Sequence, residues 1–400
     1  MRLPPPPTPR EVLSVAPPAR RRARGARTWT LLGVLAVVLL LALLSLLVVA
    51  LIVGSTGVVG FLVGTVLATL PAVVVVAAFL WVDRWEPEPR GLLAFLFAWG
   101  AIVAALAAAL LNSIGMEVLA AAQGEAGASA GTAVLVAPVV EEVSKGLGIL
   151  AIVLLRRREF DGVVDGVVCA GMVGIGFAFT ENILYFGRAF LSGTEMGEGG
   201  GLFAAGVVFL LRGVLSPFAH PMFTTATGIG LGVAATTSRP LVRVLAPLVG
   251  LVVAVALHAT WNASAVGGFG AFVAGYAFFM VPLFLVGVAL VVWLRTREGR
   301  LIARVLPAYA QAGWIPPYDV AMVATMAGRR RARAWAKAWY GPVGERAMTA
   351  YQGVATELAF LRDRAARGVH VPEFQARERS LLLELAQHRL AFAGEHRFPG

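Results

Sequence analysis

Long apolar runs follow one another between residues 29 and 294, and most are of the length that a helix needs to cross a lipid bilayer. Short stretches with Arg, Gly or Pro separate them. The chain is therefore predicted to be an all-α, polytopic membrane bundle of about eight transmembrane helices. The predicted spans are 29–53, 57–82, 91–112, 131–155, 162–187, 202–234, 243–264 and 270–294.

The two ends of the chain have a different pattern. Residues 1–28 are rich in Pro and Arg and are predicted to be a disordered cytoplasmic tail. The hydropathy falls again at Arg295, and the region 295–400 has the apolar spacing of amphipathic helices with Pro and Gly between them. A small cytoplasmic helical domain is expected there, and 29–294 is expected to be the transmembrane domain.

Composition supports a membrane protein, because 58% of the 400 residues are hydrophobic and only 14% are charged. The net charge of +11 comes from Arg in short loops and at the ends, and no nucleic-acid motif accompanies it. Arg-rich loops alternate with loops almost free of Arg, which predicts a multi-pass protein of the cell membrane with both termini in the cytoplasm. The lipid bilayer is thus an expected partner, and nucleic acid is not. The single cysteine, Cys169, excludes an intramolecular disulfide and a zinc site built from cysteines.

Ionisable residues are rare within the predicted spans, and each is costly in hydrocarbon, so they mark a candidate site. Span four places Glu141, Glu142 and Lys145 within one or two helical turns, where the lysine can neutralise a glutamate. His258 and Asn262 share a face of span seven. Helical rise puts these groups near the midplane, in a cavity that opens outward. The remaining members are Glu181 on span five, and Arg212 and His220 on span six.

Two carboxylates, two imidazoles and an amide in a sheltered cavity best match peptide hydrolysis. Glu141 or Glu142 is expected to deprotonate a water molecule, with the other glutamate and Lys145 tuning its charge. His220 and His258 are expected to orient that water or to bind a divalent metal, with Glu181 as a third ligand or a second acid. Asn262 is expected to stabilise the oxyanion.

Other interpretations of the same residues exist. A Glu–Lys pair can be a structural staple, a lone buried histidine can be an ordinary core residue, and Asn182 or Asn262 can join helices by a hydrogen bond. Two further functions remain open, a proton-coupled transporter and a catalytically silent membrane scaffold.

The motifs resemble those of the PrsW family of intramembrane proteases, which belongs with the CAAX prenyl endopeptidases. The resemblance covers roughly 80–295 and is carried by DRWEPEP at 83–89, EEVSK at 141–145 (an EExxK motif), FAFTEN at 177–182, HPMFTTATGIGLG at 220–232 and HATWN at 258–262.

The resemblance implies a helical membrane protease that cuts a single-span membrane protein, such as an anti-sigma factor, on its extracytoplasmic side. PrsW proteins are described as metalloproteases, whereas the CAAX relatives resemble glutamate proteases without a metal. The chain has Lys145 where those relatives carry arginine, and Glu181 where they carry histidine. The site could therefore use a divalent metal such as zinc or be metal-free.

Overall fold

The computed structural model describes residues 3–13, 24–156, 160 and 162–392. Within these ranges all regular structure is helical, which confirms the predicted fold class. Six continuous helical runs are long and apolar enough to cross a membrane: Leu32–Val82, Arg90–Leu155, Val163–Met196, Gly200–Thr236, Pro240–Val266 and Gly268–Gln311.

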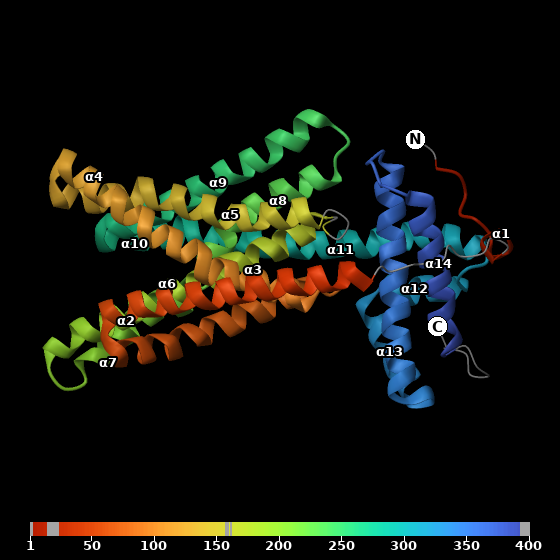
Figure 1. The fold of residues 1–400 in the computed structure, drawn as a ribbon, viewed down its shortest axis with the longest axis horizontal. Coiled ribbons are helices and arrows are strands. Elements are labelled where there is room, and N and C mark those ends of the chain that lie inside the picture. The colour runs from red at the N-terminus through yellow and green to blue at the C-terminus, as the bar shows by residue number, and fades with distance from the viewer. Residues whose placement is uncertain (1–2, 14–23, 157–159, 161, 393–400) are drawn as a thin grey trace.

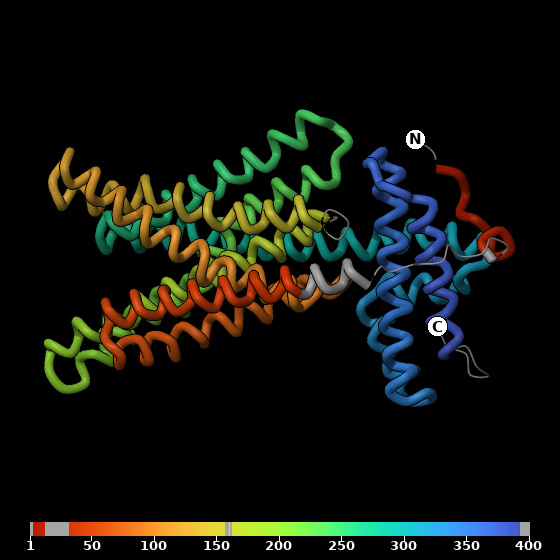
Figure 2. The backbone as a smooth tube through the Cα atoms, viewed as in Figure 1, coloured from red at the N-terminus to blue at the C-terminus, as the bar shows by residue number. Residues whose placement is uncertain are grey.

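Two of these six runs reverse direction once, so each of the two corresponds to a pair of the eight predicted spans. Helix α2 (Arg24–Val82) turns at Gly57, where φ is 68°, and α4 (Ala105–Gly131) turns at Gly124, where φ is 77°. Glycine adopts this left-handed conformation without a steric penalty, so each reversal needs no separate loop. Figure 1 shows the two antiparallel arms of α2, and Figure 2 follows both turns along the backbone.

The third span is longer than predicted. The segment 112–130, expected to be a loop, is helical apart from the reversal at Gly124. Its sequence is rich in alanine and contains no proline, so nothing local stops the helix before that glycine.

Helix α6 (Val163–Gly193) runs through the centre of the bundle and is the most buried of the spanning runs. Glycines allow its neighbours to approach backbone to backbone. A Cβ on Gly100 would lie 2.0 Å from the carbonyl oxygen of Val173, and one on Gly228 would lie 2.0 Å from that of Gly166. The positions of the polar side chains that these helices carry are thereby fixed by close packing.

Several spans change their helical pitch close to the polar residues. The segments η1 (Trp99–Ala104), η2 (Thr132–Val136) and η4 (Leu210–Leu215) are π-helical. Ser216 then leaves the helix before Pro217, and α8 (Ala219–Thr236) begins. Single π turns are frequent at functional sites because they reorient side chains within a helix.

The other spanning elements are α3 (Arg90–Ala98), α5 (Ala137–Leu155), η3 (Thr194–Met196), α7 (Gly200–Phe209), α9 (Pro240–Val266), α10 (Gly268–Gly275), η5 (Tyr276–Met280) and α11 (Val281–Gln311).

The C-terminal helices form a separate apolar core at one end of the bundle, here called the domain end (Figure 1). They are α12 (Pro317–Val323), α13 (Met326–Ala366, reversing at Gly341) and α14 (Phe374–Leu390). Helix α11 passes from the bundle into this helical domain without a break, so the predicted boundary at residue 295 falls inside a helix. Trp85, from the loop after α2, belongs to the same core, and Arg329 Nη1 donates to its carbonyl over 2.9 Å.

Residues 3–13 differ from the disorder expected for 1–28. Pro9–Leu13 form the short helix α1, and Val12 is 1% exposed within the core of the helical domain. Residues 24–28 begin α2. Residues 1–2 and 14–23 lie outside the described part of the chain.

The two ends of the bundle carry different charges. Loops 83–89 and 237–239 and the exit of α11 lie at the domain end, whereas the reversals at Gly57 and Gly124 and the α6–α7 turn lie at the far end (Figure 1). Arginines gather at the domain end, among them Arg84, Arg90, Arg156, Arg239, Arg243, Arg295, Arg297 and Arg300.

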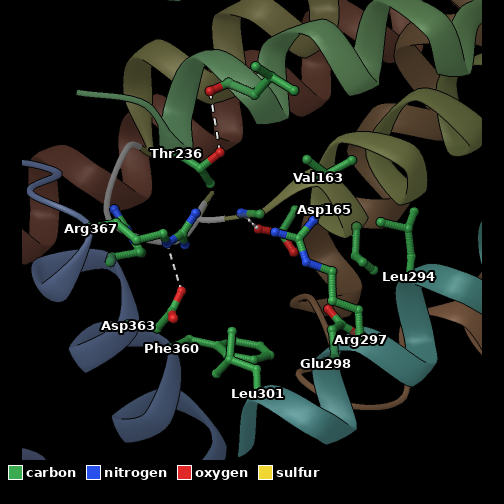
Figure 3. Close-up of a pocket in the computed structure, with 14 residues that line it drawn as sticks. Val163, Asp165, Thr236, Leu294, Arg297, Glu298, Leu301, Phe360, Asp363 and Arg367 are labelled. Atoms are coloured by element: carbon green, nitrogen blue, oxygen red, sulfur yellow. Dashed lines mark hydrogen bonds and ion pairs between the residues drawn. The ribbon is translucent and has the colours of Figure 1, made fainter. Parts of the chain in front are cut away.

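A cavity of about 240 Å³ lies where the bundle meets the helical domain (Figure 3). Apolar side chains such as Leu294 and Phe360 line part of it. Its charges balance, because Arg297, Arg364 and Arg367 face it together with Asp165, Glu298 and Asp363. Asp165 accepts from Gly162 N over 2.8 Å, and Asp363 is 2.7 Å from Arg367 Nε, so these acids are engaged in the junction itself.

Candidate active site

The paired glutamates and the lysine lie on α5, which begins at Ala137 just after the π-helical segment η2. Helical spacing puts Lys145 one turn beyond both glutamates. All three side chains are buried, Glu142 and Lys145 completely. The site is roughly 21 Å along α5 from Leu155, which is more than half the thickness of a hydrocarbon core of about 30 Å.

Glu142 has partners on both carboxylate oxygens. Its Oε1 accepts from Lys145 Nζ over 2.8 Å and lies 3.0 Å from His258 Nδ1, and its Oε2 accepts from Thr224 Oγ1 over 2.8 Å. A buried carboxylate needs such compensation to stay charged. Glu142 therefore joins α5 to α8 and α9.

Glu141 is the less satisfied of the two acids. Asn112 Nδ2 is 3.5 Å from its Oε1, and Oε2 is buried without a hydrogen-bond partner among the described residues. Two nitrogens lie somewhat farther from this Oε2, Lys145 Nζ at 3.6 Å and His258 Nε2 at 3.7 Å. Glu141 thus has an oxygen that can still accept a hydrogen bond or bind a cation.

The tautomers of both histidines follow from their partners. His258 Nδ1 faces the Glu142 carboxylate, so it carries the proton, and Nε2 presents a lone pair toward Glu141 Oε2. His220 Nδ1 faces the Lys145 ammonium at 3.2 Å, so it is the acceptor, and Nε2–H donates to Glu181 Oε2 over 2.7 Å. With His258 as this neutral tautomer, Glu141 Oε2 and His258 Nε2 are two acceptors that face each other, and no donor lies within hydrogen-bond distance of Glu141 Oε2 among the described residues.

Glu181 is held by side chains from two other elements, His220 on α8 and Arg212 on η4. Arg212, on the π-helical segment η4, donates Nη2 to Glu181 Oε2 over 2.5 Å and Nε to Asn182 Oδ1 over 2.9 Å. Arg212 thus pairs with a glutamate of the neighbouring helix α6. The Arg212 and Glu181 side chains are 26% and 19% exposed, so this flank is the open side of the cluster.

Aromatic rings surround the cluster. The Lys145 ammonium lies 3.9 Å from the centroid of the Phe177 ring, and the Phe223 ring stacks on His258 at 5.2 Å. The rings of His220 and His258 lie 5.0 Å apart. Such walls exclude bulk water and strengthen the electrostatic interactions between the groups they enclose.

The structure brings Glu141, Glu142, Lys145, His220 and His258 together, with Glu181 bound to His220. Asn262 is not among them, because its Nδ2 donates to the carbonyl of Ala133 in η2 over 2.8 Å. Its place on α9 is four residues beyond His258, yet its amide joins α9 to η2. Cys169 is a buried residue of the α6 core.

One group of residues has the donor atoms of a metal site. Atoms of Glu141, His220 and His258 all lie within 4.8 Å of one another. The sequence suggested the same two histidines but with Glu181 as the carboxylate. Glu181 is instead neutralised by Arg212 and bound to His220.

Three contributors were missed at the level of sequence. Thr224 Oγ1 donates a hydrogen bond to Glu142. The Nε1–H group of Trp99 donates to the carbonyl of Ser144 over 3.0 Å and so fixes α5. The Phe177 ring lies over the Lys145 ammonium. Thr224 could have been found, because it lies one helical turn after His220 and so shares its face. Trp99 and Phe177 give no such signal, since aromatic residues are common throughout the spans.

Comparison with known proteins agrees with this geometry. The model of the family described as PrsW family intramembrane metalloprotease matches residues 88–291, half of the chain, including every residue of the cluster. The chain is also similar to the protein named Protease PrsW of Geobacillus kaustophilus (strain HTA426), at 27% identity over 163 residues. That match spans 40% of the chain and 62% of the relative's length. No solved structure matches. The cluster lies within a family match that spans half the sequence, and the chain therefore belongs to the PrsW family of intramembrane metalloproteases.

Proposed function

We propose that the protein is an intramembrane peptidase that hydrolyses a peptide bond of a membrane-anchored protein, with Glu141 as the general base. The observation that carries the proposal is the pair of facing acceptors, Glu141 Oε2 and His258 Nε2, 3.7 Å apart in a buried site. Such a pair needs a hydrogen-bond donor or a cation beside it, and a water molecule supplies two donors.

In the proposed reaction, Glu141 takes a proton from that water as its oxygen attacks the scissile carbonyl carbon. The C–O bond forms and the carbonyl π electrons move to oxygen. The protonated Glu141 then returns its proton to the departing amine as the C–N bond breaks. Lys145, 3.6 Å from Glu141 Oε2, lies where its positive charge offsets the negative charge of the tetrahedral intermediate.

The other residues position these groups. Glu142 orients Lys145 and His258, and the pair Glu181–Arg212 orients His220. We assign to Lys145 the oxyanion role that was expected for Asn262, because the Asn262 amide donates to the carbonyl of Ala133 in η2.

The residues present fit a divalent metal, because two imidazoles and one carboxylate are a catalytic zinc donor set and one buried Glu141 oxygen lacks a hydrogen bond. Glu141, His220 and His258 would hold it, Glu141 through Oε2, which would leave Oε1 of the same carboxylate to take the proton, and His220 Nδ1 first giving up Lys145. A bound zinc ion would supply Lewis acidity toward the carbonyl and lower the pKa of water.

The substrate is proposed to be a single-span membrane protein, of which anti-sigma factors are the class that the resemblance implies. Arginines at the domain end support an orientation with that end, and so both described ends of the chain, in the cytoplasm. The site then lies in the extracytoplasmic half of the bilayer, and cleavage is expected there.

The test is co-expression of the wild type or Glu141→Gln with the host's single-span membrane proteins, followed by mass spectrometry of released fragments. Fragments that appear with the wild type and vanish with Glu141→Gln support the proposal. The matched control is Glu117→Gln, which changes an exposed acid of α4 and should leave the fragments unchanged.

The same preparations separate the two rival functions. A proton-coupled transporter would take up protons with its substrate into proteoliposomes and release no fragments. A silent scaffold would tolerate Glu141→Gln and retain its membrane partners.

A further inference from the structure

Residues 3–13 lie against the helical domain, where they contact α13 and the turn between α11 and α12 (Figure 1). Val12 is buried in the core that contains Trp314 and Ile315, and Pro6 is buried as well. The segment begins with four consecutive prolines, Pro4 to Pro7. Proline fixes φ near −65°, so such a run favours the polyproline II conformation.

Two side chains of the helical domain bind the carbonyls of this run. Trp314 Nε1 donates to the carbonyl of Pro7 over 2.5 Å, and Arg362 Nη2 donates to that of Pro4. In a polyproline II helix, which has three residues per turn, the carbonyls of Pro4 and Pro7 would lie on one face, one turn apart. Its carbonyls are not used within the helix, which leaves them free for recognition by outside donors.

The two donors are held in place by the domain itself. Arg362 Nη1 donates to Glu378 Oε1 over 2.6 Å, and the same oxygen accepts from Tyr309 Oη over 2.5 Å. Tyr309 and Trp314 are buried in the core. A donor that is already ordered loses little entropy on binding, which favours a peptide site.

We propose that the helical domain carries a binding site for proline-rich segments in the polyproline II conformation, and that residues 3–13 are its resident ligand in the same chain. The ligand it takes offers two carbonyls one turn apart, followed by an apolar side chain that fills the position of Val12. Aromatic residues with nearby donors are the usual means of recognising such segments. The site is independent of the peptidase proposal, since none of its residues lies in the acid cluster.

The test uses the whole membrane protein in detergent and a fluorescent peptide of residues 3–13, LPPPPTPREVL. We expect the peptide to bind a variant lacking residues 2–13. It should bind the intact chain at least tenfold more weakly, because the tethered segment competes at an effective concentration of about millimolar. A peptide with Ala at the four consecutive prolines should bind the deletion variant at least fivefold more weakly.

Trp314→Phe keeps a smaller aromatic ring in the core and removes the indole N–H donor, so in the deletion variant it should weaken peptide binding at least fivefold. The matched control is Trp339→Phe, an exposed tryptophan of the same domain, which should leave binding unchanged. A deletion variant that melts like the intact chain but binds no peptide, or equal binding by Trp314→Phe, overturns the proposal.

A second measurement avoids the deletion. Trypsin cleavage after Arg10, which is exposed in α1, requires the segment to leave the domain. In the intact chain, Trp314→Phe should speed this cleavage severalfold and Trp339→Phe should not. Equal cleavage rates in all three proteins would count against a bound segment, whatever the fate of the deletion variant.

Discussion

Glu141 and Glu142 are neighbours in sequence, but only Glu142 has hydrogen-bond partners at normal distances on both carboxylate oxygens. Glu142 accepts from Lys145 and Thr224 and contacts His258, whereas Glu141 Oε2 is buried without a hydrogen bond among the described residues. A helix turns consecutive side chains by about 100°, so adjacent acids face different neighbours. The two glutamates should therefore respond differently to the same substitution.

Glu141→Gln is expected to lower cleavage by about a factor of 10²–10⁴, the usual contribution of a general base, with little change in stability. Glu142→Gln should also lower cleavage, but it should destabilise the fold by about 3–5 kcal/mol as well, because it removes the nearer counter-charge of the buried Lys145 and leaves only Glu141, 3.6 Å away. Thermal unfolding in detergent beside a cleavage assay separates the two effects. Equal melting temperatures for both variants would contradict this division of roles.

Arg212→Gln is expected to slow cleavage by about a hundredfold through loss of position rather than loss of a reacting group. Arg212 holds Glu181, which in turn holds His220, and a misplacement of about 1 Å can cost that much. Arg212→Lys keeps the charge but cannot reach Glu181 and Asn182 together, so its cleavage rate should lie between those of the wild type and Arg212→Gln. The predicted effect is on kcat with KM little changed. A rise in KM alone would assign Arg212 to substrate binding.

Metal removal tests the three-residue donor group. The purified protein should retain about one divalent ion per chain, and a chelator should remove both the ion and the activity until zinc is restored. His258→Ala should lose the ion, because its Nε2 faces Glu141, whereas His388→Ala, in the helical domain, should keep it. Full activity of a chelated, metal-free preparation would favour Glu141 and Lys145 acting alone.

Asp83 gives the fold a pH dependence. Burial raises the pKa of its carboxyl to about 7, in spite of the hydrogen bond from Glu88 N, which lowers it. Because the folded state holds this proton more tightly than the unfolded state, the free energy of unfolding should fall as pH rises from about 4 to 7 and level off above that range.

Asp83→Asn should flatten this slope, since an amide oxygen can still accept from Glu88 N without ionising. Melting temperatures between pH 4 and pH 8 provide the measurement. Glu117→Gln, at an exposed acid of α4, is the control and should leave the slope unaltered. A slope that persists in Asp83→Asn would assign the pH dependence to another group.

Gly228→Ala tests the close contact between α6 and α8. The added Cβ would lie 2.0 Å from the carbonyl oxygen of Gly166, so the helices must separate, at a cost of about 1–3 kcal/mol or more. Because α8 carries His220 and Thr224, activity should fall with stability. Gly206→Ala, with nothing within 4 Å of the added atom, should change neither, and melting curves with parallel cleavage assays would show it.

The sequence by itself was sufficient for the class of fold. Insertion of a helix depends on local hydropathy, so the apolar runs predict the spans, and Arg in alternate loops predicts which ends lie together. The reversal at Gly57 was foreseen as a short loop between the first two spans, but the helical character of 112–130 was not, because this alanine-rich segment has no local stop signal before Gly124. The packing of residues 3–13 was also missed, since it depends on donors more than 300 residues away.

The sequence also named the acids and imidazoles of the site, because charge within an apolar span is rare and helical spacing places Lys145 beside both glutamates. Only the tertiary structure decided which glutamate has an oxygen without a hydrogen bond. It also decided that Glu181 pairs with Arg212 and His220, and that Asn262 donates to a carbonyl of η2. Those outcomes depend on how α5, α6, α8 and α9 are rotated and spaced against one another. Periodicity within one helix carries no information about the rotation of its neighbours, which is set by glycine contacts and π-helical turns between distant segments.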